Sequence, residues 1–267
     1  MNRVVSRFWI IGILVALGAS SQARADNKDK WGGVKGQIFL DATAAPVPVQ
    51  LQVTKDQGVC LAKGQIDSEA LIVNKANLGV KNVFVWLIPE DVKSKEPLDI
   101  HPSLKAIKKK EVEVDQPCCM FVPHALCMRE GQTLVAKNSS TIAHNFHWTG
   151  DPRFNPGGNS IIPAGKDLQV KDLTAAPTPV KMACDVHPWM NGWIRVFKHP
   201  YYALTDKDGK FEIKNAPAGP CRIVIWHEEK GWVDSENMEK GQGKFGRKIE
   251  IPAGKTLERD AIKMGQP

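Results

Sequence analysis

Frequent breaks in the apolar pattern are the strongest constraint on how this chain can fold. Its 267 residues include 18 prolines and 22 glycines, and no long stretch has clean helical periodicity. Short segments rich in Val, Ile, Phe and Trp lie between Gly, Pro, Asn and Asp clusters, a pattern typical of strands and turns. Examples are residues 34–40, 80–89, 133–138 and 223–226. The pattern predicts an all-β protein built of β-sandwiches rather than a parallel α/β sheet.

The N-terminal segment has the order of a secretory signal peptide. Arg3 and Arg7 precede the apolar run 8–18, and the small-residue cleavage signal Ala23-Arg24-Ala25 follows it. The run is shorter than the roughly 20 residues that span a bilayer. We therefore expect residues 1–25 to be cleaved after Ala25, leaving a periplasmic or secreted mature chain without a membrane span.

The charge balance argues against a nucleic-acid partner. Removal of the three arginines of the signal peptide would lower the formal net charge from +7 to +4, which is a weak bias. The basic run 105–110 is more typical of a solvated loop than of a binding patch, although such a run can steer an acidic redox partner.

All six cysteines lie in the expected mature chain, at positions 60, 118, 119, 127, 184 and 221. An exported chain meets an oxidising compartment, so disulfides are expected. Cys118 and Cys119 are neighbours and are too close to pair with each other in ordinary geometry. Cys60 with Cys119 is the pair that we expect, although spacing alone leaves the connectivity open.

The segment Cys184-Asp-Val-His187-Pro-Trp-Met190 carries the chemistry. It places a thiolate, an imidazole and a thioether in one tight loop before a second apolar strand, residues 193–197. A Cys thiolate, two imidazoles and a weak Met contact suit one copper ion that cycles between Cu(I) and Cu(II). In the alternative interpretation each residue has a purely structural role: Cys184 forms a disulfide, His187 lies in a surface turn and Met190 packs in the core. The occurrence of all three residues at this spacing favours a copper site over three separate structural roles.

The second imidazole must come from elsewhere, and the segment 138–147 offers His144 and His147. Side chains alternate along a strand, so His144 and Phe146 share one face while His147 lies on the other. We prefer His144, because Ile142 and Phe146 on its face would shield a copper ion from water. The role of His147 stays open, and His124 is expected to be structural.

The pair His144-Asn145, followed by the Cys184-x-x-His187-x-x-Met190 loop, resembles the ligand pattern of the cupredoxins, a family that includes plastocyanin, amicyanin and pseudoazurin. The resemblance covers residues 111–198 and implies a Greek-key β-sandwich with one type-1 copper. It also implies that Asn145 locks the ligand loop. Pro188 and Trp189 could form an electron-transfer patch, although Trp189 could equally pack over the loop. Met182 departs from the family, which usually has an aromatic residue there.

The C-terminal stretch 203–219, with its Asp208-Gly209 hairpin turn, resembles the carboxypeptidase-regulatory-like, transthyretin-like β-sandwich. Residues 33–39 and 83–87 resemble the opening strands of the same module. We therefore expect a signal peptide (1–25), an N-terminal β segment (26–110), a copper domain (111–198) and a regulatory-like sandwich (199–267). Our hypothesis is one discontinuous sandwich, made of 26–110 and 199–267, into which the copper domain is inserted.

The resemblance implies one-electron transfer between redox partners such as a cytochrome or a dehydrogenase, through a His187 loop near the surface. We expect no enzymatic reaction, because multicopper enzymes need His-x-His clusters and the sequence has none. The alternatives are a copper carrier or sensor, and a surface binding module with a structural or degenerate metal site.

Overall fold

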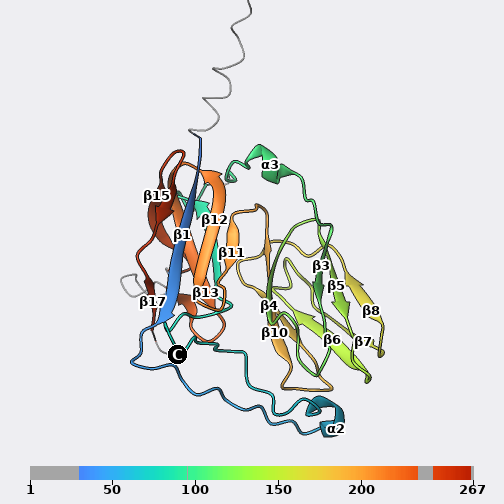
Figure 1. The fold of residues 1–267 in the computed structure, drawn as a ribbon. Helices are drawn as coiled ribbons and strands as arrows, with labels where there is room; N and C mark the ends of the chain where they lie inside the picture. The colour runs from blue at the N-terminus through green and yellow to red at the C-terminus, as the bar shows by residue number, and fades with distance from the viewer. Residues whose placement is uncertain (1–29, 95, 234–242, 266–267) are drawn as a thin grey trace, which may run out of the picture.

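The computed structural model describes residues 30–94, 96–233 and 243–265, and its strands form two packed groups (Figure 1). The predicted signal peptide, residues 1–25, lies outside the described residues. Among the described residues, no helix is long and apolar enough to cross a membrane. Helical structure there consists of three short turns: α2 (Gln57–Cys60), α3 (Pro102–Lys105) and the 3-10 turn η1 (Gly243–Phe245). The prediction of an all-β fold is confirmed.

The first group of strands, here called the flanking sandwich, has two sheets. The strands of one sheet, in order of pairing, are β12 (Lys210–Pro217), β1 (Trp31–Leu40) and β16 (Thr256–Glu258), with β17 (Ile262–Met264) also paired to β1. Those of the other are β11 (Tyr202–Leu204), β2 (Phe84–Pro89), β13 (Gly219–His227) and β14 (Gly231–Val233), with β15 (Arg247–Ile251) paired to β13.

Alternation along the strands builds the core of the flanking sandwich. In β12, Phe211 and Ile213 are buried, whereas the neighbouring Lys210 and Glu212 are exposed. Because side chains alternate with a period of two residues, one face of the strand lies against the core and the other faces solvent. Val34 of β1 belongs to the same buried cluster. The apolar pattern therefore sets which face of each strand packs inward.

The second group, here called the inserted sandwich, also has two sheets. The strands of one, in order of pairing, are β4 (Ala125–Arg129), β10 (Asn191–Phe197), β9 (Val180–Ala183), β6 (His144–Thr149) and β7 (Gly158–Ile162). Those of the other are β3 (Glu111–Val114), β5 (Thr133–Lys137) and β8 (Asp167–Val170). Between the sheets lie fully buried apolar side chains, among them Met128, Leu134, Phe146, Met182 and Ile194.

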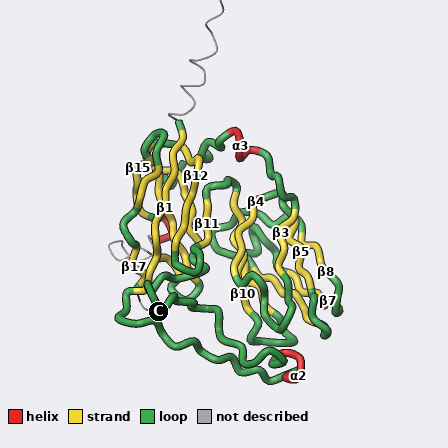
Figure 2. The backbone as a smooth tube through the Cα atoms, in the orientation of Figure 1, coloured by secondary structure: helices red, strands yellow, loops and turns green. Residues whose placement is uncertain are grey.

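Strands from before and after the inserted sandwich share both sheets of the flanking sandwich. β1 pairs with β12, and β2 pairs with β13, which is the arrangement that a discontinuous sandwich requires. The N-terminal segment 26–110 is not uniform, however. Val53, Cys60 and Ile66 pack into the core of the inserted sandwich, on a long excursion made mostly of loop (Figure 2). This part of the segment 26–110 therefore packs with the inserted sandwich rather than with the flanking one.

Aromatic side chains fill the junction between the two sandwiches. Phe84, Trp86 and Trp226 of the flanking sandwich form a buried cluster with Phe197 of the inserted one. The buried guanidinium of Arg195 lies 4.4 Å from the centre of the Trp86 ring, a cation–π contact between the sandwiches. The interface is thus a small shared core, which fixes how the two sandwiches sit together.

We expect the unfolding free energy of the metal-free protein to fall as pH drops from about 6.5 toward 4. Burial lowers the pKa of His199 and of His227 to about 4, whereas in the unfolded chain both regain a pKa near 6.5. The unfolded state therefore binds protons that the folded state does not. Urea denaturation at about pH 7 and about pH 5 measures the difference. In His227→Gln, the difference in unfolding free energy between the two pH values should be smaller. Equal unfolding free energies of the wild-type protein at both pH values would contradict the explanation.

Candidate metal centre

The loop between β9 and β10 gathers the predicted ligands at one end of the inserted sandwich. These strands pair antiparallel, so residues 184–190 must turn back within a few positions. Two backbone hydrogen bonds close the turn: Cys184 N–H donates to the Met190 carbonyl at 3.3 Å, and Met190 N–H donates to the His187 carbonyl at 2.9 Å. Cys184, His187 and Met190 are all buried.

His144 lies on the neighbouring strand and faces this loop. β6 pairs with β9, and along β6 the side chains of His144 and Phe146 are fully buried while His147 is half-buried. Asn145, between His144 and Phe146, is also buried, so burial along β6 decreases toward its end rather than alternating. His147 does not join the cluster, because its Nδ1 lies 2.9 Å from a carboxylate oxygen of Asp185.

Three potential ligand atoms converge within the cluster. His144 Nδ1 lies 2.9 Å from His187 Nδ1, and Cys184 Sγ lies 3.9 Å and 3.8 Å from these two nitrogens. An ion at ordinary metal–nitrogen and metal–sulfur distances of about 2.0 and 2.3 Å would contact all three. These residues therefore form a candidate metal site, and Met190, which ends the same loop, is also buried.

The protonation state of His144 suits a metal ligand. Burial, followed by the nearby His187, lowers the pKa of His144 to about 4, so the imidazole is neutral at neutral pH and offers a lone pair. Its Nε2 is buried and has no hydrogen-bond partner among the described residues. Because the two Nδ1 atoms face each other, an ion between them would give both lone pairs a partner.

Asn145 ties the ligand loop to β6. Its Oδ1 accepts hydrogen bonds from Asp185 N–H at 2.7 Å and Val186 N–H at 3.1 Å, and lies 3.1 Å from Cys184 Sγ. Its Nδ2 donates to Asn159 Oδ1 at 2.6 Å. When the sulfur binds metal and loses its proton, the two backbone donors still hold the loop, which is the role expected for Asn145.

An excursion from the flanking half covers the site. Residues 50–67, here called the strap, form a loop whose base is closed by pairing of Gln50 with Asp67. The carboxylate of Asp56 in the strap lies 2.8 Å from His187 Nε2. The predicted disulfide between Cys60 and Cys119 is present and ties the strap to the inserted sandwich. His187 itself has an exposed fraction of 0%, although Asp185 and Pro188 of the same loop are exposed.

Asp56 is a residue at the site that sequence reasoning missed. It lies 131 positions from His187, and no local motif marks it. Its backbone has a positive φ of 49°, a conformation that Asp tolerates better than most residues. The expected pairing of Cys60 with Cys119 was the only hint, since it brings the neighbourhood of residue 60 to the inserted sandwich.

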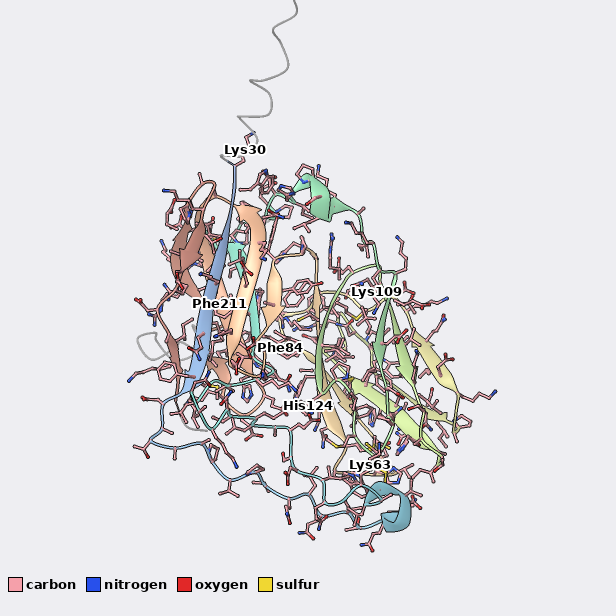
Figure 3. All side chains as sticks on the ribbon, viewed as in Figure 1. Lys30, Lys63, Phe84, Lys109, His124 and Phe211 are labelled. Atoms are coloured by element: carbon pink, nitrogen blue, oxygen red, sulfur yellow. A yellow bond between two sulfur atoms is a disulfide. The ribbon has the colours of Figure 1, made fainter. Side chains whose placement is uncertain are left out.

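The other singled-out residues have structural contacts. Trp189 is half-buried against the core, and its Nε1 donates to the Cys119 carbonyl at 3.2 Å, whereas Pro188 is exposed. His124 lies between the two sandwiches (Figure 3), where its Nε2 contacts the carboxylate of Glu228. Cys184 is a free thiol, which removes the disulfide interpretation of the ligand loop.

Comparison with known proteins gives partial likenesses only. No protein-family model and no curated protein matches the chain. An amicyanin variant in its oxidized state is 17% identical, covering 35% of this chain and 87% of its own, with a TM-score of 0.30. A purple cupredoxin from Nitrosopumilus maritimus is 20% identical over 32% of this chain and 98% of its own, with a TM-score of 0.28. The case for the site therefore rests on its own geometry.

Replacing Asn145 by Ala should lower the unfolding free energy by about 1–3 kcal/mol, because two partly buried backbone N–H groups lose their acceptor. Metal affinity should fall with it, since the loop is no longer held against β6. Chemical denaturation and metal titration measure the two effects. Asn191→Ala is the matched control: Asn191 bonds the opposite end of the loop through Pro188 and Trp189 carbonyls at 3.3 Å. Equal losses in both variants would contradict the assigned role.

Proposed function

We propose that this chain is an exported type-1 copper protein that transfers single electrons between redox proteins. One observation carries the proposal: two imidazole nitrogens and a thiol sulfur converge in a buried site, and Met190 at the end of the same loop is also buried. Copper bound there would supply one-electron chemistry by cycling between Cu(I) and Cu(II). The proposal includes export, for which the N-terminal sequence pattern is the support.

The donor set and its surroundings suit this role. Cys184 supplies a soft sulfur that favours Cu(I), and the two imidazoles tolerate both oxidation states. Burial of His144, Cys184 and His187 excludes water, which protects the thiolate from oxidation. Asn145 and the closed loop hold the donors in place, so that little rearrangement accompanies a change of charge. A set of two imidazoles, a thiolate and a thioether leaves no open position for substrate, so we propose no enzymatic reaction.

Asp56 leads from the buried His187 toward the surface. The side chain of Asp56 has an exposed fraction of 38%, whereas that of His187 has an exposed fraction of 0%. An electron that leaves through His187 would therefore pass the strap rather than a bare imidazole edge. We propose that a partner such as a cytochrome or a dehydrogenase docks on this end of the molecule, where Pro188 is also exposed.

A copper carrier is the second candidate, and the covered His187 is the observation that favours it. A carrier needs no edge for electron exit, but it must release Cu(I) to an acceptor. Reversible voltammetry of the copper-loaded protein separates the two, because a carrier should exchange Cu(I) readily and show little reversible redox cycling.

The Cu(II)-loaded protein should show an intense visible thiolate-to-copper band and a narrow electron paramagnetic resonance hyperfine splitting. Both should disappear in Cys184→Ser, because the hydroxyl cannot replace the thiolate donor. Cys221→Ser should retain both, since Cys221 is another buried free thiol but belongs to the core of the flanking sandwich. Absence of the band from the wild-type protein would overturn the electron-transfer proposal.

Asp56→Asn should weaken copper binding by about 10- to 100-fold, the usual cost of altering a group that orients a ligating histidine. The reduction potential should rise, because loss of a negative charge beside the site destabilises Cu(II) more than Cu(I). Asn also tolerates the left-handed backbone at this position, so the strap keeps its course. Asp67→Asn is the control, because it removes one negative charge at the base of the strap; it should change neither the copper affinity nor the reduction potential. Equal shifts in both variants would exclude a specific role for Asp56.

A further inference from the structure

A second group of soft ligands adjoins the first. The sulfurs of Cys60 and Cys119 and a ring nitrogen of His187 all lie within 4.8 Å of one another. His187 thus belongs to two potential metal-binding groups, one with His144 and Cys184 and the other with the two cysteines. All three side chains of the second group are buried, so any ion held there would be shielded from water.

A cavity of about 350 Å³ reaches this group at Cys60, and two more sulfur-bearing side chains, Cys118 and Met120, are among its lining residues. Lys63 and Gln65 of the strap also line it and are exposed. Lys63 lies beside α2 at the foot of the inserted sandwich (Figure 3). Thiol and thioether donors select Cu(I) among the metals that a protein meets.

The strap stays in place by more than its disulfide. Val53 and Ile66 are buried in the core of the inserted sandwich, and Leu51 N–H donates to the Ile66 carbonyl at 2.8 Å. The bond between Asp56 and His187 adds a polar contact. Breaking the sulfur–sulfur bond would therefore leave Cys60 and Cys119 next to His187 as two separate thiols.

We propose that Cys60 and Cys119, once reduced, form a second metal site with His187 that binds Cu(I) arriving through the sulfur-lined cavity. An external dithiol supplies the two electrons: it becomes a disulfide, and the Cys60–Cys119 bond becomes two thiols, which lose their protons when Cu(I) binds. In the oxidised protein the two sulfurs are bonded to each other and the site is closed. His187 is the residue common to this site and to the His144–Cys184 centre.

The test uses Cys184→Ser protein, so that the first centre is disabled and the outcome does not depend on the proposed electron-transfer function. Oxidised protein, and protein reduced with a phosphine that is then removed, are titrated anaerobically with Cu(I) against a chromophoric Cu(I) chelator. We expect the reduced form to bind one Cu(I) per chain more than the oxidised form. Copper K-edge absorption should show two sulfur donors and one nitrogen donor.

Variants in the same background assign the ligands. Adding Cys60→Ser or Cys119→Ser should abolish the extra Cu(I), whereas Cys118→Ser should retain it, because Cys118 is the free neighbour of Cys119. Circular dichroism checks that each variant is folded. If a variant does not fold, the donor count of the reduced Cys184→Ser protein decides alone.

Any one of three outcomes would overturn the proposal. In the first, the reduced and oxidised forms bind the same amount of Cu(I). In the second, the extra Cu(I) depends on Cys118 rather than on Cys60 and Cys119. In the third, the absorption spectrum of the extra Cu(I) lacks two sulfur donors. Failure of the electron-transfer proposal would instead show as a missing thiolate band in the oxidised wild-type protein, so the two proposals can fail independently.

Discussion

The hydrogen bonds to one amide oxygen, Asn145 Oδ1, hold the ligand loop in register with the strand that carries His144. Asn145 follows His144 directly, so fixing the loop to Asn145 also fixes Cys184 and His187 relative to His144. Without that tie, a short loop between two antiparallel strands could turn its side chains in several directions. With it, three donor atoms converge in a space from which the apolar core excludes water. Position and burial together make the site suitable for copper.

The two sandwiches are less independent than their topology suggests. The strap leaves the flanking half, covers His187 with Asp56 and is tied to the inserted sandwich by the Cys60–Cys119 disulfide. The aromatic junction around Trp86 fixes the remaining interface. A fragment limited to residues 111–198 would therefore lose the carboxylate that bonds to His187 and one half of the disulfide. The flanking sandwich contributes to the site as well as to the architecture.

Local patterns predicted much of this structure. Short apolar segments and frequent Gly and Pro gave the all-β class, and the side-chain alternation expected of a strand favoured His144 over His147 as the ligand. The ligand loop was readable because its residues are close in sequence. The covering of His187 by the strap could not be predicted from the sequence. Asp56 is 131 residues away from His187, and the contact between them depends on the path of the strap. Long-range contacts of this kind follow from the packing of Val53 and Ile66, which no local pattern specifies.

The central claim is that His144, Cys184 and His187 bind one copper ion beneath the strap. A crystal structure of the copper-loaded oxidised protein, with anomalous differences measured at the copper edge, tests it most directly. We predict one strong peak between the Nδ1 atoms of His144 and His187 and the sulfur of Cys184, with Asp56 still bonded to His187 Nε2. A peak elsewhere, or no peak in protein shown to contain copper, would contradict it.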